Sequence, residues 1–527
     1  MKKIKLKYEP RKQQVEILDF VKRSIDSDKK FMMIDAPTGV GKSFAAVMIA
    51  DWYSKEVNPD AKIDILTNSK ILQDQYTKDF DFISSIKGSN SYWCKNNMMN
   101  CGESKAFNKL KNSRCQSCPH SIAQSAFINN RVGLTNFHLI TAYSMYSPDL
   151  LDERGARLLI IDEAHAFEET FCDFISSTVS QRSLSLFDIW EDWMAKDLDE
   201  INNLNQLSEY ISRIIIPRMS LKINELLEEA KETRGKKKRA EMVKKADICD
   251  KTMCKYNRFV GDRANYSTNW IFEKDLDQSG NTRILVEPIW GSQYLKEMFW
   301  DKYDHVILMS GTILNPDMLS KMLGIENESR DYIALPCPFP KENRPIIYVK
   351  FGKMSYYEKA DTFKRAVPII KKILERNSKN KGIIHTGNYQ FNKWIQNSIK
   401  NKRLLIHDSS TREKMLDHHL RSELETVLVS PSMMNGVDLK DELSRFQIIL
   451  KVPFPNLMSS KIKKRLETNP DWYNWKTLVD VMQSYGRSIR SRNDWAETYV
   501  LDSCFDQVIS RDMPDYFKEA LKIKRLG

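Results

Sequence analysis

Long apolar runs are missing from this sequence. No uninterrupted apolar stretch in the chain approaches the roughly 18 to 20 residues that a membrane-spanning helix requires, and the mean hydropathy is −0.50. The basic N-terminal segment meets Glu9, Pro10 and Arg11 where a signal peptide would need its apolar stretch. We therefore expect a cytoplasmic protein that does not span a membrane.

Cysteine is also scarce. Nine cysteines in 527 residues are too few for a disulfide-stabilised scaffold. Four of them nevertheless crowd into the segment from Cys94 to Cys118, which in a cytosolic chain indicates metal or cluster ligation. The chain has no internal repeat and no long Pro-, Ser- or Gln-rich tract, so we expect most of it to be folded.

Basic residues exceed acidic ones. The chain has 82 Lys and Arg against 70 Asp and Glu, which gives a net charge of +12. This excess favours a polyanionic partner such as nucleic acid, although charge alone is weak evidence. At roughly 100 to 200 residues per domain, the length indicates several domains.

Short β-branched apolar runs recur along the chain, bounded by turn residues or charges. They are residues 31–36, 62–67, 157–162, 305–310, 381–386, 425–430 and 446–451. Helical patterns lie between many of them, for example at 43–55 and 356–377. Because continuous apolar strands that alternate with helices are typical of parallel sheets, we predict an α/β fold.

Two stretches interrupt this alternation. Residues 86–131 contain the four crowded cysteines and are strongly basic, with Glu103 as their single acid. Residues 171–262 show a helical pattern that includes the charged run Lys236–Arg239, and they contain no convincing strand. We predict a helical insertion over this second stretch.

The segment Ile34–Ser43, IDAPTGVGKS, places an apolar strand, a turn-rich loop and a helix start in the order of a phosphate-binding loop. Gly39 and Gly41 would let backbone N–H groups point at phosphate oxygens. Lys42 would reach the β and γ phosphates, and the Ser43 hydroxyl would ligate Mg²⁺. The segment therefore predicts an ATP site.

A second pattern completes this site. In LLIIDEAH, Leu158–His165, a buried-strand run ends in two carboxylates. Ligands bind at the carboxyl ends of parallel strands, so Asp162 and Glu163 would emerge at the nucleotide. Asp162 suits Mg²⁺ binding, and Glu163 suits a general base that orients the attacking water.

With this DEAH box, the sequence resembles the superfamily 2 helicases, and further motifs narrow the resemblance to the iron-sulfur DNA helicases of the XPD and DinG type. The motifs follow the family's order: YEPRKQQ (8–14), TNSKILQDQ (67–75), TNFHLI (135–140), MSGTIL (309–314), IIHTGNY (383–389), MNGVDL (434–439), LKVPFP (450–455) and QSYGRSIRSRNDW (483–495). The resemblance implies that Arg11 and Gln14 bind the adenine side of the nucleotide. It also implies a nucleotide contact for Asp438.

The last of these motifs has a mechanical interpretation. Gln483, Arg487 and Arg490 repeat at i, i+4 and i+7, so on a helix they share one face. They would then point across a cleft at the γ-phosphate held by the first domain. Because arginine from a facing domain stabilises transition-state charge, the pattern predicts domain closure that depends on ATP.

The four crowded cysteines are Cys94, Cys101, Cys115 and Cys118. Four thiolates suit either Zn²⁺ or an iron-sulfur cluster. Spacing does not decide between them, because only the last two are close together and His120 is a possible spare ligand. Their position before TNFHLI resembles the place where the family carries its [4Fe-4S] domain, so the resemblance implies a cluster, with zinc as the alternative.

The resemblance further implies two RecA-like parallel-sheet motor domains, with an iron-sulfur insertion and a helical arch-like insertion in the first. The first motor domain would comprise residues 1–85, 132–170 and 263–335, the iron-sulfur domain 86–131, the arch-like domain 171–262 and the second motor domain 336–527.

The function that the resemblance implies is an ATP- and Mg²⁺-dependent DNA helicase or translocase, moving 5′ to 3′ on single strands in DNA repair, recombination or replication. Thr67, Ser69, Gln75 and Asn136 would contact the strand. The partners would be single-stranded DNA and forked duplex DNA, and we expect a monomer. Two alternatives stay open: an RNA helicase, because DEAH boxes also serve RNA remodelling, and a clamp whose ATPase gates attachment to nucleic acid without unwinding.

Overall fold

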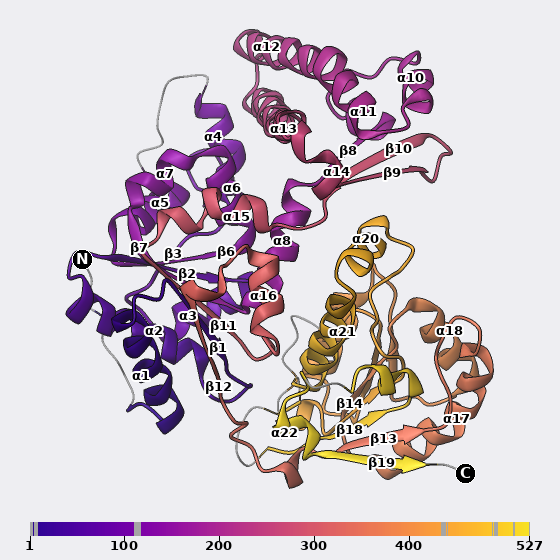
Figure 1. Ribbon diagram of the computed structural model, residues 1–527. Coiled ribbons are helices and arrows are strands. Elements are labelled where there is room, and N and C mark those ends of the chain that lie inside the picture. Colours follow the sequence, from indigo (N-terminus) through magenta and orange to yellow (C-terminus); the bar gives the residue numbers. More distant parts are fainter. Residues whose placement is uncertain are drawn as a thin grey trace.

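Figure 1 shows the protein as a computed structural model. The structure describes residues 4, 9–109, 117–433, 439, 441–486, 488, 489, 494–509 and 512–525. Its two large sheets have seven strands each and form the cores of two domains. No helix among the described residues is long and apolar enough to cross a membrane.

The first sheet holds the N-terminal half of the chain. Its strands, in spatial order, are β12 (Arg330–Ala334), β1 (Phe31–Asp35), β11 (His305–Ser310), β7 (Ala156–Asp162), β2 (Lys62–Thr67), β6 (Val132–Asn136) and β3 (Ser84–Ser85). Every neighbouring pair runs parallel. The first four predicted strands are confirmed, and they form the centre of the sheet.

Helices cover both faces of this sheet, because side chains alternate between the faces along each strand. Met32 and Ile34 of β1 pack with α1 and α2, whereas Phe31 and Met33 pack with α6 and α8 on the other face. The helices of this domain are α1 (Lys12–Asp26), α2 (Lys42–Trp52), α3 (Lys70–Asp79), α5 (Pro119–Asn129), α6 (Phe137–Tyr146), α7 (Pro148–Arg154), α8 (Phe167–Ile175), α15 (Ser292–Met298) and α16 (Pro316–Leu323).

The second sheet repeats this architecture. Its strands, in spatial order, are β15 (Leu404–Ile406), β16 (Val427–Ser430), β14 (Gly382–His385), β17 (Phe446–Ile449), β18 (Glu497–Val500), β13 (Ile346–Lys350) and β19 (Leu521–Arg525), all parallel to their neighbours. Its helices are α17 (Lys359–Arg376), α18 (Tyr389–Ser398), α19 (Arg412–Arg421), α20 (Ser460–Thr468), α21 (Pro470–Tyr485) and α22 (Asp515–Lys518). The remaining three predicted strands are confirmed as β14, β16 and β17.

A mostly helical unit projects from the first domain (Figure 1). Its helices are α9 (Gln181–Ser185), α10 (Met194–Glu200), α11 (Leu204–Tyr210), α12 (Ile216–Glu232), α13 (Lys236–Gly261) and α14 (Tyr266–Asn269). At its base lies an antiparallel sheet in the order β8 (Ser177–Ser180), β10 (Thr282–Pro288) and β9 (Trp270–Leu276).

This base differs from the sequence prediction in two ways. Residues 171–262, predicted to lack a strand, contain β8, and β10 pairs with β8 and β9 in a separate sheet rather than with the first sheet. Four residues with one apolar side chain among them, Ser-Thr-Val-Ser, are too short and too polar to predict a strand. β8 forms because the β9–β10 hairpin offers it a free edge.

The cysteine segment lies beside this projection. Its described elements include β4 (Trp93–Cys94), β5 (Met99–Asn100) and α4 (Cys101–Lys109). α4 packs against α13 (Figure 1), and the Lys244 ammonium lies 3.6 Å from Oε1 of Glu103. The two insertions of the first domain are therefore in contact.

Candidate functional site

The phosphate-binding loop connects β1 to α2 at the carboxyl edge of the first sheet. Gly39 and Gly41 have φ angles of 95° and 87°, in the left-handed region that favours glycine. A Cβ atom at Gly39 would lie 2.0 Å from the Phe339 ring, and one at Gly41 would lie 2.4 Å from Nε2 of Gln14. Both positions need glycine for conformation and for space, and Lys42 begins α2 directly afterwards.

The two predicted adenine-side residues hold this loop from the start of α1. Nε2 of Gln14 donates to the Val40 carbonyl at 3.0 Å, and Nη1 of Arg11 donates to the Gly39 carbonyl at 2.9 Å. Oε1 of Gln14 accepts from the Arg11 backbone N–H at 2.8 Å, which orients the amide. The structure thus places Arg11 and Gln14 against the backbone of the loop that would wrap the phosphates.

Asp162 is the last residue of β7 and Glu163 follows it, so both lie at the same edge of the sheet as the phosphate-binding loop. Asp162 is buried; its Oδ1 accepts from the Glu163 N–H at 3.1 Å and its Oδ2 from the Tyr76 hydroxyl at 3.0 Å. Burial, followed by the charge of Glu163, raises the pKa of Asp162 to about 6, against the opposing effect of Lys42. A divalent cation beside Asp162 would offset this burial cost.

The oxygen donors at this point suit Mg²⁺. Ser43 lies in the first turn of α2, and its side chain lowers the pKa of the Tyr76 phenol against the effect of burial, which places the Ser43 hydroxyl near the phenol that contacts Asp162. One hydroxyl and one carboxylate beside a phosphate-binding loop are the few protein ligands that Mg²⁺ takes when phosphate oxygens and water complete its shell. Ser43 and Asp162 therefore fit the ion.

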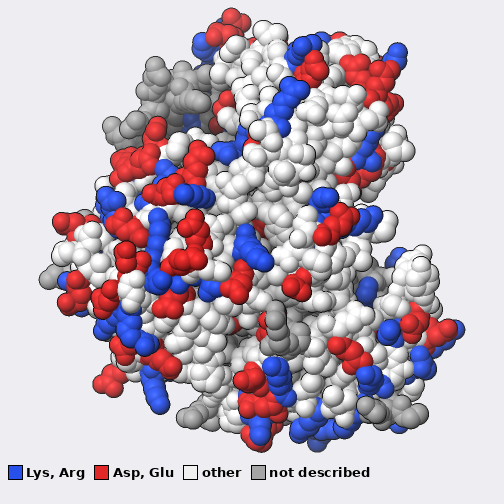
Figure 2. Space-filling view, viewed as in Figure 1, with Lys and Arg blue, Asp and Glu red and all other residues white. Residues whose placement is uncertain are grey.

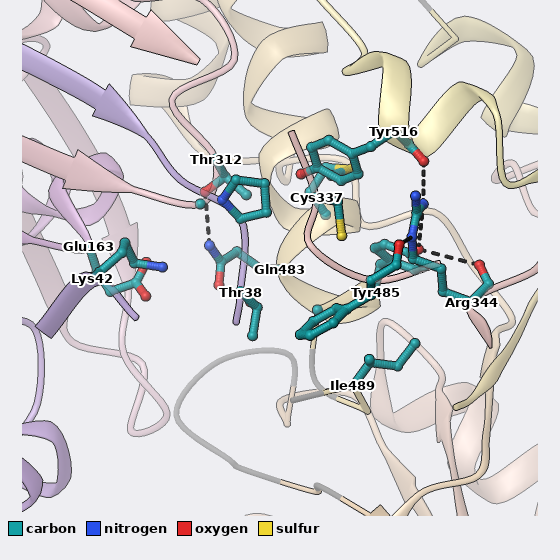
Figure 3. A pocket seen from close by; sticks show the side chains of 15 residues that line it. Thr38, Lys42, Glu163, Thr312, Cys337, Arg344, Gln483, Tyr485, Ile489 and Tyr516 are labelled. Atoms are coloured by element: carbon teal, nitrogen blue, oxygen red, sulfur yellow. Dashed lines mark hydrogen bonds between the residues drawn. The ribbon is translucent and has the colours of Figure 1, made fainter. Parts of the chain in front are cut away.

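A chain of polar contacts leads from Glu163 to the second domain, and Figure 3 shows its last link, between Thr312 and Gln483. Nδ1 of His165 lies 3.5 Å from Oε2 of Glu163 and 2.8 Å from Oγ of Ser310. Oγ of Ser310 lies 3.2 Å from Oγ1 of Thr312, which accepts from Nε2 of Gln483 at 2.8 Å. The DEAH segment, MSGTIL and the end of α21 thus form one network across the domain boundary.

A cavity lies between the two domains at this network (Figure 3). The first domain lines it with Pro37, Thr38, Lys42, Glu163, Gly311 and Thr312, the connecting segment with Cys337 and Phe339, and the second domain with Arg344, Met482, Gln483, Tyr485, Gly486, Ile489 and Tyr516. Of the predicted nucleotide contacts in the second domain, Gln483 lines the cavity. Arg487, Arg490 and Asp438 lie outside the described residues.

The four predicted strand contacts gather at the carboxyl ends of two neighbouring strands. Thr67 and Asn136 are register partners at the ends of β2 and β6. The Ser69 hydroxyl caps α3 by accepting from the Leu72 N–H at 3.3 Å, and Asn136 caps α6. Thr67 and Asn136 are buried, whereas Gln75 on α3 is exposed.

Three of the four crowded cysteines lie together. Cys94, Cys101 and Cys118 form one buried cluster, and the Ser104 hydroxyl donates to the Cys94 sulfur at 3.2 Å. Cys115 lies outside the described residues, and within the described ones no group of three or more His, Cys, Asp or Glu side chains is arranged to hold a metal ion. A thiolate-ligated group therefore stays a prediction for this segment, with zinc and iron-sulfur equally open.

Three aromatic residues at the site were not predicted from the sequence. Tyr76 contacts Asp162, Phe339 packs on the phosphate-binding loop, and Tyr485 lines the cavity. Tyr76 follows the predicted contact Gln75, and Tyr485 lies inside the last motif, so the motifs could have pointed to both residues. No motif lies next to Phe339, because its contact with Gly39 spans the connection between the domains.

Comparisons with known families agree with this geometry. A family model described as the type III restriction enzyme res subunit matches residues 7–187, and one described as the helicase C-terminal domain matches residues 376–520. The two matches fall on the first and the second motor domain respectively.

Several curated proteins are similar to this chain. A probable ATP-dependent helicase of Methanocaldococcus jannaschii is 26% identical over 47% of this chain and 42% of its own length. The ATP-dependent DNA helicase DinG of Photobacterium profundum is 24% identical over 46% of this chain and 37% of its own length. The matches thus span less than half the length of these two relatives. The ATP-dependent DNA helicase YoaA of Haemophilus influenzae is 20% identical over 98% of this chain and 93% of its own length.

Solved structures share the fold. An XPD helicase superimposes with a TM-score of 0.64 at 14% identity, covering 98% of this chain and 100% of the other. Xpd4 of S. tokodaii superimposes with a TM-score of 0.55 at 14% identity, with the same coverage. The two family matches, the curated relatives and the motif order support a superfamily 2 helicase of the XPD and DinG type, and the solved structures show the shared fold.

Proposed function

We propose that the protein is an ATP- and Mg²⁺-dependent DNA helicase that moves 5′ to 3′ along single-stranded DNA. The observation that supports it most directly is the cavity between the two sheets, where Lys42 and Glu163 of one domain share a lining with Gln483 of the other. A nucleotide bound there would contact both domains, so its hydrolysis would change how they sit together. Relatives named as DNA helicases support DNA as the substrate.

The first domain would hold and activate the nucleotide. The N–H groups of the phosphate-binding loop and the Lys42 ammonium would bind the phosphates, with Arg11 and Gln14 on the adenine side. Ser43 and Asp162 would hold Mg²⁺, which neutralises charge on the β and γ phosphates.

Side chains from both domains would take part in the reaction. Glu163 would orient the attacking water and accept its proton, because phosphoryl transfer depends on positioning more than on covalent chemistry. Gln483, Arg487 and Arg490 would reach the γ-phosphate from across the cleft and stabilise the charge that develops. Asp438 would contribute a further nucleotide contact. Hydrolysis would therefore require closed domains.

The strand would pass over the carboxyl edge of the first sheet. Thr67, Ser69, Gln75 and Asn136 stand there, at the ends of β2 and β6 and on α3. Figure 2 shows acidic and basic side chains interspersed over one face of the molecule, with no single basic stripe on it. We therefore expect sequence-tolerant binding built from local phosphate contacts and stacking, and weakened by salt.

The two insertions would enclose the strand. The contact between α4 and α13, with its pair Lys244–Glu103, supports a passage closed on the outer side. Cys94, Cys101, Cys115 and Cys118 would ligate a [4Fe-4S] cluster, which would cross-link a segment with little other core. Iron and acid-labile sulfide in anaerobically purified protein would support the cluster. Stoichiometric zinc would support the zinc alternative instead.

The test is strand separation with ATP and Mg²⁺ on duplexes that carry a 5′ tail, a 3′ tail or a fork. We expect unwinding of the 5′-tailed and forked duplexes and none of the 3′-tailed one. Glu163→Gln is the matched control: it should bind ATP and DNA without unwinding. Unwinding of the 3′-tailed duplex alone would refute the polarity. DNA-stimulated ATP hydrolysis without unwinding would favour the clamp, and preference for RNA tails would favour an RNA helicase.

A further inference from the structure

Tyr76 joins the two side chains that fit Mg²⁺. It lies on α3 and is 1% exposed. Its hydroxyl donates to Oδ2 of Asp162 at 3.0 Å. The Ser43 side chain lowers the pKa of the same phenol, against the effect of burial. The phenol therefore contacts the carboxylate of the predicted magnesium site and lies near its hydroxyl.

This contact decides how the Asp162 carboxylate is oriented. Its other oxygen accepts from the Glu163 N–H at 3.1 Å, so the two hydrogen bonds together define the plane of the carboxylate. A hydrogen bond to a charged group is stronger than one between neutral groups. Partners that orient metal ligands typically change metal affinity or activity by about 10- to 100-fold when they are removed.

The helix that carries Tyr76 reaches the predicted strand contacts. Ser69 is its N-cap residue, and the exposed Gln75 precedes Tyr76. Nε2 of the buried Gln73 donates to the Ser85 hydroxyl at 2.8 Å and to the Ile86 carbonyl at 2.6 Å, which anchors the middle of the helix. The Tyr76 ring packs against Phe80 with centroids 6.2 Å apart. A shift of α3 would therefore move the phenol oxygen with it.

We infer that Tyr76 is a positioning residue for the magnesium site, and that α3 transmits the presence of a bound single strand to Asp162 and Ser43 through it. The inference rests on the proposed function, because it assumes a Mg²⁺-nucleotide in the cleft and a strand on α3. The inference adds a coupling between strand binding and Mg²⁺-nucleotide binding that lies within the first domain and does not involve the second domain.

The test uses Tyr76→Phe, which removes one oxygen atom and keeps the ring. Tyr303→Phe is the matched control, because the buried Tyr303 hydroxyl also donates to an aspartate, Oδ2 of Asp64 at 3.0 Å, near the amino edge of the same sheet. Binding of a fluorescent N-methylanthraniloyl-ADP is titrated with Mg²⁺, so no hydrolysis is needed. We expect Tyr76→Phe to raise the half-saturating Mg²⁺ concentration about 10-fold or more and Tyr303→Phe to leave it unchanged.

The same titration with oligodeoxythymidine tests the transmission. In the wild type and in Tyr303→Phe, we expect the oligonucleotide to lower the half-saturating Mg²⁺ concentration, and Mg²⁺-ADP to strengthen oligonucleotide binding by the same factor, because coupling is reciprocal. In Tyr76→Phe this factor should approach one. Thermal unfolding of both variants checks that they remain folded.

Three results would count against the inference. Superimposable Mg²⁺ titrations of Tyr76→Phe and Tyr303→Phe would overturn the positioning role. If Tyr76→Phe raises the half-saturating Mg²⁺ concentration but the oligonucleotide still lowers that concentration by the wild-type factor, the transmission through α3 would be overturned. A wild type without Mg²⁺-dependent nucleotide binding would refute the proposed function itself, and the inference with it.

Discussion

The two motor sheets have the same number of strands and the same strand direction, yet they turn opposite edges towards the nucleotide cleft. In the first sheet, the cleft residues Thr38, Glu163 and Thr312 follow the carboxyl ends of β1, β7 and β11. In the second sheet, Arg344 and Tyr516 precede β13 and β19 and therefore stand at amino ends. The first sheet therefore faces the cleft with its carboxyl edge, and the second sheet faces it with its amino edge.

The difference separates two kinds of chemistry. Carboxyl ends of strands lead into helix N-termini, whose unpaired N–H groups bind anions such as phosphates. The second domain instead presents side chains from the end of α21, with Gln483 in the cavity. The first domain is thus built to hold a nucleotide, and the second to complete the site when the domains approach.

The contacts between the domains differ as much as their edges. In the cleft, Nε2 of Gln483 donates to Oγ1 of Thr312 at 2.8 Å. Outside it, Nη2 of Arg465 on α20 lies 2.7 Å from Oε1 of Glu168 on α8, with both side chains buried and with Trp290 beneath the guanidinium. A buried pair is costly to open, so we expect the domains to stay joined there while the cleft opens.

The largest expected effect is a loss of ATP hydrolysis, and it tests the phosphate-holding edge, which is the carboxyl edge of the first sheet. Lys42→Ala removes the ammonium that would bind the β and γ phosphates, so we expect ATP hydrolysis to fall by about 100- to 1,000-fold or more. A coupled phosphate-release assay with saturating single-stranded DNA measures it. Lys55→Ala, at an exposed ammonium paired with Asp51, is the control and should be normal. Normal turnover in Lys42→Ala would remove the loop from the mechanism.

The next prediction concerns the buried contact outside the cleft. Arg465→Met leaves Glu168 buried without its cation, and loss of one partner of a buried pair costs about 3 to 5 kcal/mol. Urea unfolding should show this loss, and the added change Glu168→Gln should recover part of it. Lys464→Met, on the exposed side of α20, is the control. A loss below about 1 kcal/mol would show that the domains do not depend on this pair.

A pH prediction concerns Asp35, the last residue of β1 on the phosphate-holding edge. Burial raises its pKa to about 6, so between about pH 4 and 6 the folded protein keeps a proton that the unfolded chain releases. The free energy of unfolding should therefore fall as pH rises through this window, by about 3 kcal/mol from this group.

Asp35→Asn should lack this fall. The difference in unfolding free energy between wild type and variant, measured at pH 4 and at pH 7.5, isolates the contribution of the carboxyl from other titrating groups. The exposed Asp60→Asn is the control. A difference that is the same at both pH values would contradict the assignment.

The smallest effect tests the contact across the cleft. Gln483→Ala removes the hydrogen bond to Thr312, so we expect kcat for ATP to fall about 10-fold with little change in KM. Thr312→Val should behave alike, and the double variant should be no worse than either, because the two groups act as a pair. The exposed Gln396→Ala is the control. Additive losses would mean that the two residues act independently.

Most of the fold could be predicted from the sequence, because the strands are continuous apolar runs. All seven predicted runs form strands, and the helix predicted at 356–377 is α17. The other seven strands of the two large sheets were not predicted, and neither was β8, whose four residues pair with β10 only because the chain returns about a hundred residues later. A strand that forms only because a partner strand is present has little sequence pattern from which it could be predicted.

The nucleotide residues could be predicted where the motif is local. Gly39, Gly41 and Lys42 form a loop whose chemistry lies within a few residues, and the structure places it at the carboxyl end of β1. Their roles stay predictions until nucleotide binding is measured. The Arg465–Glu168 pair had no comparable signal, because its partners lie 297 residues apart.

The sequence by itself determined the strand order along the chain, the class of site and the family, because these depend on short-range patterns of apolar residues, glycines and carboxylates. Only the tertiary structure decided that the second sheet turns its amino edge to the cleft, that Tyr76 reaches Asp162, and that the two insertions touch. Those facts depend on which distant segments pack together, and packing is set by the shape and burial of whole domains rather than by any local run of residues.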